Sequence, residues 1–392
     1  MNGTIVVAKA TKCFDQTRNL ETIEMNPLSA VAASVLAVSV AAQAQNSIFL
    51  VENTPNLPGD NFLSAIAGDA ENDLWAVGSL SLHFDGSTWT AIPLAATNQM
   101  NGVAVLSASD VWAVGRTIRI PFALVSQIQH FDGNSWSVVE SPHFPLGEEL
   151  KAVQAVSDQD IFAVGSFKDD EFQTQSPLVE HFDGTTWSTV PAPRFGRHQG
   201  AVLNSLTIIS DSDIWAVGRA GSLDFSNDRP FAMHFDGSTW TEVSVPSVEN
   251  AHFHELQGVA AVATDDVWAV GTFLGPGIFE QTLIVHFDGT AWSIVASPNQ
   301  ESSNNILLGV SVVSSNSVWA VGCGPCLDVL EITGTSIEHW DGTQWTITPA
   351  PETPSIASSV LGFSSGTVFV AGEKADEFDR AATHVLSTNA GQ

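Results

Sequence analysis

Two short stretches, VWAVG at Val267–Gly271 and HFDGTAW at His286–Trp292, decide the fold because near-copies of both recur along the chain. Copies of the first motif start at Leu74, Val111, Ile161, Ile214, Val267, Val318 and, in the altered form VFVAG, at Val368. Successive copies are 37, 50, 53, 53, 51 and 50 residues apart, which is the period of propeller blades or solenoids. The chain is therefore built from seven repeats.

Each repeat has the pattern of four short strands. In the fifth repeat, the stretches 256–262, 266–271, 282–288 and 291–297 are rich in β-branched and aromatic residues, with Gly, Pro, Asn and Asp between them. Within VWAVG, Trp268 and Val270 point to one face, whereas Ala269 and Gly271 point to the other. A neighbouring sheet can approach that small face closely. The sequence predicts an all-β, seven-bladed β-propeller with four-stranded blades.

The last repeat lacks a fourth strand, because only STNAGQ follows its third strand, ATHVL. The missing pattern is found at the other end of the chain, where SIFLVENTPN from Ser47 matches WSIVASPN from Trp292. We expect this N-terminal strand to complete the last blade, close the ring and remove exposed sheet edges. The propeller domain then covers residues 45–392.

Residues 1–44 have the pattern of an N-terminal extension and a signal peptide. An apolar Ala/Val-rich core follows Met25 and ends in Ala42-Gln43-Ala44, so we expect cleavage after Ala44. Met1 and Met25 both remain possible starts, and a buried or membrane-anchoring helix is the alternative interpretation. The prediction is a secreted protein, extracellular or periplasmic, with no membrane insertion of the mature chain.

The composition limits the classes of molecule that the protein can bind. The chain has 392 residues, 44% of them hydrophobic, which is enough for a substantial core. It carries 43 acidic against 13 basic residues, a formal net charge of -30, and this charge repels polyanions. We therefore expect no nucleic-acid partner and no binding to anionic membrane surfaces.

The second motif combines histidine, aspartate and tryptophan, but its six copies argue for scaffold rather than for a reactive site. Asp288 and Gly289 fit a tight hairpin turn between the third and fourth strands. We predict structural roles for the repeated aromatic residues and histidines: Trp75, His83, Trp112, His130, His181, Trp215, His234, Trp268, His286, Trp319, His339 and His384. The sequence identifies no catalytic group, no metal ligands and no cofactor.

The WAVG and HxDGxxW repeats resemble those of bacterial secreted propeller proteins, which are loosely similar to kelch and Asp-box propellers. The likeness covers Ser47 to about His384 and implies a fold only. Asp and Gly are adjacent here, whereas one residue separates them in the Asp box. The chain also has no tyrosine, which galactose oxidases use for their radical and their copper ligands and sialidases use as the nucleophile.

The variable loops concentrate on one face of the predicted ring. The links between second and third strands and between successive blades emerge there, while the short Ser/Asp loops and the DG turns emerge on the opposite face. We call the first the variable face and expect specificity there. Its candidate ligand-binding residues are Arg116, Arg119, His143, Arg194, Arg197, His198, Arg219, Arg229, His252 and His254. Gathered guanidinium groups suit a carboxylate, sulfate or phosphate.

An alternative is that each arginine pairs with a local acid, as Arg229 can with Asp224 or Asp228.

The string Cys323-Gly324-Pro325-Cys326 is that of the thioredoxin active site, but it follows a WAVG strand instead of starting a helix. In an exported protein, two such cysteines most simply form a local disulfide in a surface loop. That bridge contributes about 2 kcal/mol at most, so it holds the loop rather than the fold.

Three functions are compatible with these observations. The favoured one is a non-catalytic propeller that binds an extracellular glycan or protein through the variable face. The second is a polysaccharide lyase, in which the segment Arg194–His198 neutralises a uronate carboxylate and supplies a base. The third is a structural component of a surface layer or filament. The oligomeric state stays open.

Overall fold

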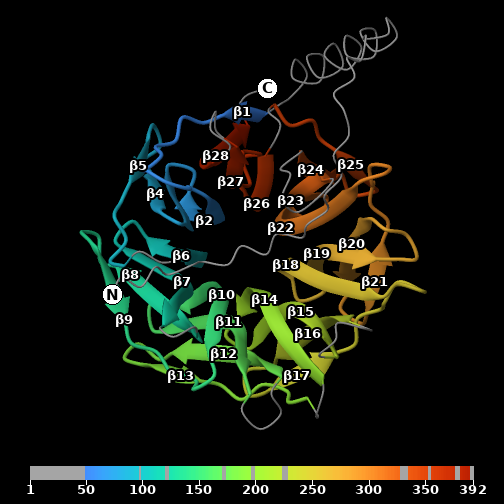
Figure 1. Cartoon of the computed structure of the whole chain (residues 1–392), viewed down its shortest axis with the longest axis horizontal. Coiled ribbons are helices and arrows are strands. Elements are labelled where there is room, and N and C mark those ends of the chain that lie inside the picture. The colour runs from blue at the N-terminus through green and yellow to red at the C-terminus, as the bar shows by residue number, and fades with distance from the viewer. Residues whose placement is uncertain are drawn as a thin grey trace, which may run out of the picture. The chain divides into compact units, whose positions relative to one another are not determined.

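The computed structural model describes residues 49–96, 99–119, 123–169, 174–195, 199–222, 228–326, 334–351, 355–375 and 380–388. These residues form seven four-stranded antiparallel sheets and contain no helix, so none that could cross a membrane. The sheets follow one another round a ring (Figure 1). The predicted seven-bladed propeller is confirmed. The proposed leader and its cleavage site lie outside the described residues.

Each blade is numbered by its order round the ring. Blade 1 contains β2 (Leu63–Ala70), β3 (Asp73–Gly78), β4 (Ser81–Phe84) and β5 (Trp89–Ala91). Blade 2 contains β6 (Gln99–Ser107), β7 (Asp110–Arg119), β8 (Ala123–Phe131) and β9 (Trp136–Val139). Blade 3 contains β10 (Glu148–Ser157), β11 (Asp160–Lys168), β12 (Gln175–Phe182) and β13 (Trp187–Thr189). Blade 4 contains β14 (Gln199–Ser210), β15 (Asp213–Ser222), β16 (Arg229–Phe235) and β17 (Trp240–Val243).

The remaining blades follow the same order. Blade 5 contains β18 (Phe253–Ala263), β19 (Asp266–Leu274), β20 (Glu280–Phe287) and β21 (Trp292–Val295). Blade 6 contains β22 (Asn304–Ser314), β23 (Ser317–Cys326), β24 (Thr335–Trp340) and β25 (Trp345–Ile347). Blade 7 combines β26 (Ser355–Gly362), β27 (Val368–Ala375) and β28 (Ala381–Thr388) with β1 (Phe49–Val51) from the N-terminal part.

The ring closes through β1, as the sequence predicts. Phe49 pairs with Thr388 and Val51 with Leu386 on the neighbouring strand β28. The Phe49 side chain is 1% exposed and meets Trp319 of blade 6 edge to face, with the ring centroids 5.8 Å apart. It takes the place that the tryptophan of the HFDG motif holds in the other blades. Closure is therefore fixed by backbone pairing and by a buried aromatic ring.

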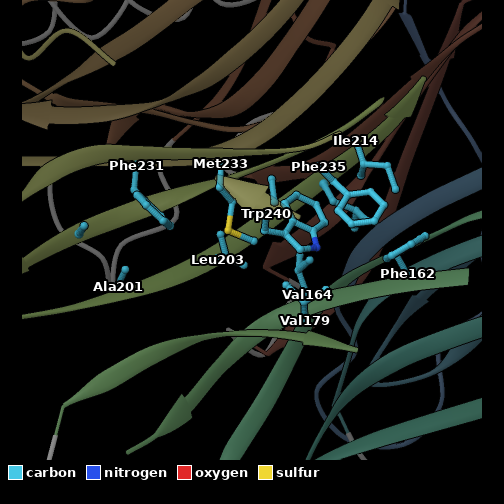
Figure 2. Packing of buried hydrophobic residues seen from close by; sticks show 13 residues of the cluster. Phe162, Val164, Val179, Ala201, Leu203, Ile214, Phe231, Met233, Phe235 and Trp240 are labelled. Carbon is cyan, nitrogen blue, oxygen red and sulfur yellow. The ribbon is translucent and has the colours of Figure 1, made fainter. Parts of the chain in front are cut away.

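The core consists of seven hydrophobic clusters, one between each pair of neighbouring blades. Figure 2 shows the cluster between blades 3 and 4, where Phe162 and Val164 face Leu203 and Trp240. In the next interface, Trp215 of WAVG contacts Trp292 of the following blade, with centroids 5.3 Å apart. The large side of one WAVG strand thus packs on the small side of the next, as the alternating pattern predicts.

Every innermost strand carries a β-bulge opposite the glycine of WAVG. The register shifts by one residue at this point in all seven blades, for example between Leu203 and Ser205 in β14. A Cβ on the facing Gly218 would lie 2.0 Å from the carbonyl oxygen of Val202, and the six equivalent glycines are as crowded. The glycine of the motif is therefore required by the close approach of the neighbouring backbone.

Two carboxyl groups lie unexpectedly inside the core. Glu180 of β12 and Glu338 of β24 are 0% and 1% exposed, and they occupy the position that Leu82 and Val285 hold in blades 1 and 5. Among the described residues, neither oxygen of Glu180 has a hydrogen-bond partner. Burial raises the pKa of each carboxyl to about 8, and the charge of Glu148 adds to the effect at Glu180. The folded protein therefore holds both groups protonated at neutral pH.

We expect Gly218→Ala to destabilise the full chain by about 3 kcal/mol, because the new methyl group must displace the Val202 backbone. Gly277→Ala is the matched control, since nothing lies within 4 Å of its Cβ position. Urea denaturation followed by tryptophan fluorescence measures both changes. Equal stability of the two variants would show that the Val202 backbone can move aside without a loss of folding free energy.

The buried glutamates predict a loss of stability as the pH rises. Their folded-state pKa of about 8 lies above the model value of 4.5, so the folded chain retains protons that the unfolded chain releases between these values. The protons retained on the two glutamates therefore stabilise the folded chain fully below about pH 4.5, and this contribution is lost as the pH rises through 8. Between pH 6 and pH 8, each group should cost about 2 kcal/mol.

Urea denaturation at both pH values, on the wild type and on Glu180→Gln and Glu338→Gln, tests this expectation. Each substitution should reduce the pH dependence, whereas Glu301→Gln at an exposed position should not. A wild-type stability that is the same at both pH values would contradict it.

Candidate functional site

The repeated histidines form a hydrogen-bonded scaffold. In blades 1 to 5, His Nε2 lies 2.7–2.9 Å from the carboxylate of the aspartate that starts the second strand, as His286 does from Asp266. The imidazole of His286 also lies against Trp268, with centroids 4.3 Å apart. Sequence reasoning placed these aspartates only in the short Ser/Asp loops, without a partner. The sequence signal for this pairing is the aspartate two residues before the aromatic residue of the motif, Trp or, in blade 3, Phe162.

The last two repeat histidines depart from this pattern. His339 contacts Ser317 Oγ at 3.1 Å, because serine replaces the aspartate in blade 6. His384 pairs with Gly372, whereas the histidines of the other blades pair with the aromatic residue of WAVG. Ser387, opposite Phe369, occupies the repeat position instead. The buried His384 is thus not at the repeat position that its spacing suggested.

The DG pairs form the predicted turns. Gly289 has a φ of +84°, which favours glycine, and the five equivalent glycines are similar. The backbone N–H groups of Ala291 and Thr290 donate to Asp288 Oδ1 at 3.0 and 2.9 Å and lower the pKa of that carboxyl. This aspartate is occupied by its own turn, so the HFDG motif offers no reactive group.

A central channel of about 740 Å³ is lined by the innermost strands of all seven blades. The bulge places one side chain from each strand at the same level of this channel: Ser64, Asn101, Lys151, Asn204, Gln257, Leu308 and Ser358. We call these seven residues the mouth ring, because they lie toward the variable face. Six of the seven are polar, which suits a ligand rich in hydrogen-bonding groups.

Further along the channel, polar side chains are used to join the blades. Backbone N–H groups of one innermost strand donate to side chains of the preceding one, as Ile208 does to Gln154 Oε1 at 3.0 Å and Gly362 to Ser311 Oγ at 3.0 Å. These acceptors are occupied.

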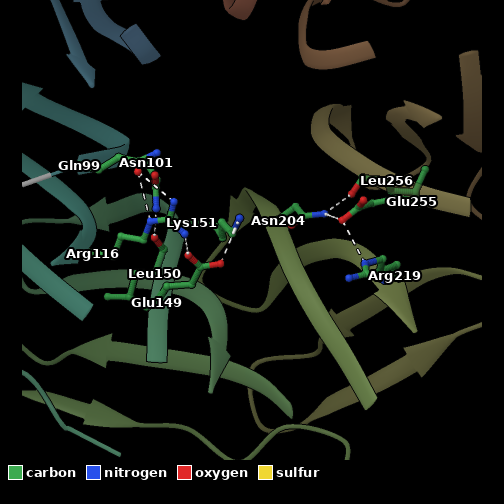
Figure 3. Close-up of polar contacts among 10 residues, drawn as sticks. All are labelled: Gln99, Asn101, Arg116, Glu149, Leu150, Lys151, Asn204, Arg219, Glu255 and Leu256. Atoms are coloured by element: carbon green, nitrogen blue, oxygen red, sulfur yellow. Dashed lines mark hydrogen bonds and ion pairs between the residues drawn. The ribbon is translucent and has the colours of Figure 1, made fainter. Parts of the chain in front are cut away.

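Blades 2 and 3 are joined by a charged cluster at the mouth (Figure 3). Arg116 Nη1 lies 2.8 Å from Glu149 of the next blade, and the guanidinium also donates to Gln99 Oε1. Lys151 Nζ lies 3.1 Å from the same glutamate. Asn101 Nδ2 donates to the carbonyl of Leu150 at 2.7 Å.

Blades 4 and 5 repeat the arrangement. Arg219 lies 2.5 Å from Asp228 and 3.4 Å from Glu255, and Asn204 Nδ2 donates to the Leu256 carbonyl at 2.8 Å (Figure 3). Burial and the charge of Glu255 raise the pKa of nearby Glu280. Arg116 is thus neutralised by an acid of the next blade, and Arg219 by Asp228 of its own blade and Glu255 of the next.

Arg229 and Arg194 differ in their surroundings. Arg229 pairs with Glu242 Oε1 at 2.7 Å, not with Asp228. Arg194 is exposed in the link between β13 and β14. The side chain of Arg119 and the whole of Arg197 and His198 lie outside the described residues, so the geometry of the dense cationic segment is not described.

The three described histidines of the variable face have distinct environments. His143 is 48% exposed, and its Nδ1 lies 2.8 Å from Oε1 of the buried Glu148. His252 is exposed. His254 is 2% exposed; its Nδ1 donates to the Asp228 carbonyl and its Nε2 accepts from the Val248 N–H, both at 3.0 Å. His254 therefore fixes a loop, whereas His143 combines exposure with a buried carboxylate partner.

The two cysteines form a disulfide between Cys323 and Cys326, with their Cα atoms 6.0 Å apart. They lie within β23, are 7% and 3% exposed, and do not belong to a surface loop as the sequence suggested. Strand pairing continues past WAVG, since Cys323 pairs with Thr335. In the described part of the chain, no cluster of three or more His, Cys, Asp or Glu residues could hold a metal ion.

The sequence matches no protein-family model and no curated protein. Its fold is similar to that of solved propellers. One is YCF48 bound to D1 peptide, with a TM-score of 0.56, 16% identity and coverage of 87% of this chain and 94% of that one. Another is the WD40 propeller domain of Doa1, with a TM-score of 0.55, 10% identity and coverage of 87% and 97%.

A third is a PL25 ulvan lyase bound to an oligosaccharide, with a TM-score of 0.54, 8% identity and coverage of 83% and 93%. At these identities the three similarities establish the propeller fold alone.

Proposed function

We propose that this chain is a non-catalytic binding module that holds an extended polypeptide ligand on the variable face, at the channel mouth. The observation that carries the proposal is the mouth ring, which brings six polar side chains from different blades to one level around a channel of about 740 Å³. A peptide backbone offers donors and acceptors at regular intervals and suits such a ring.

The charges at the mouth favour a polar ligand over a strongly anionic one. Arg116 is paired with Glu149 of the following blade, and Arg219 with Asp228 of its own blade and Glu255 of the following one, so their charge already stabilises the ring. A ligand that took these guanidinium groups would leave buried acids without partners. Ligand carboxylates therefore share the exposed Arg116 and Lys151 with Glu149 instead of displacing it, and hydrogen bonds to the amides add to this contact.

The exposed apolar side chains favour a protein ligand over a glycan. Sugar rings are commonly held against exposed aromatic rings, but eleven of the twelve tryptophans are buried in the blade interfaces. Within the described residues, the large apolar side chains that stay exposed are aliphatic. On the variable face they are Leu57, Ile118, Leu124, Leu146 and Ile278. Among the structural neighbours, YCF48 is known with a bound peptide.

The export of this module is part of the proposal. It rests on the apolar segment after Met25 and its Ala42-Gln43-Ala44 ending, together with the paired cysteines.

We expect a random peptide library displayed on phage to yield binders to the immobilised full chain, whereas a glycan array gives no signal. A selected peptide, labelled with fluorescein, is then titrated by anisotropy. Gln257→Arg, whose longer side chain obstructs the channel mouth, should weaken binding at least tenfold. Asn134→Arg, at an exposed turn on the opposite face, should change it less than twofold. Failure to select any peptide, or equal effects of the two variants, would reject the proposal.

The pair His143–Glu148 supports a second candidate, a polysaccharide lyase. A half-exposed imidazole oriented by a buried carboxylate has the geometry of a general base, and one structural neighbour is a polysaccharide lyase. Under this hypothesis the full chain releases unsaturated uronate ends from ulvan and His143→Gln stops their release. No release from ulvan or other polyuronates excludes this candidate.

A further inference from the structure

We infer that the polypeptide ligand docks along one strip of blade 2, through aliphatic side chains at its outer end and carboxylates at its inner end. This inference rests on the proposed function and specifies the chemistry of its ligand. The strip, which we call the blade 2 strip, consists of Ile118, Leu124, Leu146, His143, Arg116 and Lys151.

The outer end of the strip is apolar and unusually exposed. Ile118 of β7 and Leu124 of β8 are cross-strand partners, so their side chains share one face of the hairpin. They are 70% and 38% exposed, and Leu146 of the following link is 40% exposed. Gly147, next to Leu146, lies against the Leu124 backbone, where a Cβ would be 2.9 Å from its carbonyl oxygen. The link that carries Leu146 therefore lies against the hairpin that carries Ile118 and Leu124.

The inner end of the strip continues along the same face of the hairpin. Arg116 lies two residues before Ile118, on the same side of β7, and pairs with Ser126. The Ser126 N–H and hydroxyl donate to Glu148 Oε1 at 3.3 Å, which connects the hairpin to the His143–Glu148 pair. Lys151 then reaches the channel mouth. The strip thus connects the hairpin to the mouth ring.

At the inner end of the strip, the basic side chains face solvent and their acidic partners lie beneath them. The side chain of Arg116 is 34% exposed and that of Lys151 35%, whereas their shared partner Glu149 is 13% exposed. His143 is 48% exposed, while its partner Glu148 is fully buried. In a chain with a formal charge of -30, this strip offers basic groups to solvent and hides the acids. It complements a ligand that carries carboxylates.

The equivalent place between blades 4 and 5 lacks this arrangement. Arg219 is 19% exposed and lies between Asp228 and the equally exposed Glu255. A third acid, Glu280, lies close enough for Glu255 to raise its pKa. The blade 5 hairpin still exposes Ile278, at 84%. Blade 5 therefore presents an aliphatic side chain beside excess acid, which makes it the internal control for blade 2.

These observations identify the ligand as a segment of a partner protein in which aliphatic side chains alternate with, or adjoin, aspartate or glutamate. The aliphatic groups cover Ile118, Leu124 and Leu146, and the carboxylates face Arg116 and Lys151.

Phage selection against the full chain tests this chemistry, because the library is random. The selected peptides should be enriched in Leu, Ile or Val together with Asp or Glu. A fluorescein-labelled synthetic copy of the most frequent peptide should bind Ile118→Asp at least tenfold more weakly than the wild type. Ile278→Asp, at a still more exposed site on blade 5, should change affinity less than twofold. Raising NaCl from about 50 to about 500 mM should weaken binding severalfold, because it screens the carboxylates from exposed bases.

The outcomes separate this inference from the proposed function. Peptides that lose affinity with Gln257→Arg but not with Ile118→Asp would leave the binding function standing and overturn the docking strip. Selected peptides without acidic residues, or a stronger effect of Ile278→Asp, would also overturn it. A selection that yields no peptide at all rejects the proposed function itself. Circular dichroism and thermal unfolding of Ile118→Asp show that the variant is folded, since the changed side chain is mostly solvent-exposed.

Discussion

The whole ring depends on the close contact between each inner-strand bulge and the glycine of WAVG. The bulge brings a backbone carbonyl within 2.0 Å of the position a Cβ would take, in all seven blades. It also places one side chain from each innermost strand at the same level of the channel. One backbone irregularity, repeated seven times, therefore explains both the invariant glycine and the candidate binding ring.

The two motifs act as the two sides of one interface. The tryptophan of WAVG lies against the histidine of its own blade and contacts the aromatic residues of the HFDG motif of the next blade. In blade 7, Phe49 supplies this contact from the start of the domain. Aromatic side chains contribute large buried areas, so the interfaces between blades dominate stability. The buried Glu180 and Glu338 reduce that stability as the pH rises toward 8.

The arginines of the variable face show why residue counts alone are a poor guide to a binding site. In sequence, they suggest an anion site; in space, Arg116, Arg219 and Arg229 each meet a carboxylate. What distinguishes the blade 2 strip is which partner is exposed. There the acids are buried beneath the bases, and exposed aliphatic side chains adjoin them. Recognition at this face depends on exposure as well as on charge.

The sequence by itself determined the blade number, the four-stranded blades, the DG turns and the closing strand. These features are local or repeated: a period of about fifty residues, alternation within a strand and an Asp-Gly pair are all visible in one dimension. The seven bulge residues also leave a signal, since each follows a buried Leu, Met or Ala in the aligned repeats.

Which side chains meet across blades was decided only by the tertiary structure. Glu149 lies 33 residues from Arg116, and their 2.8 Å contact depends on the angle between two sheets. The register that removes His384 from the repeat position depends on β27 and β28 together, because strand pairing is a property of two segments and neither one specifies it alone.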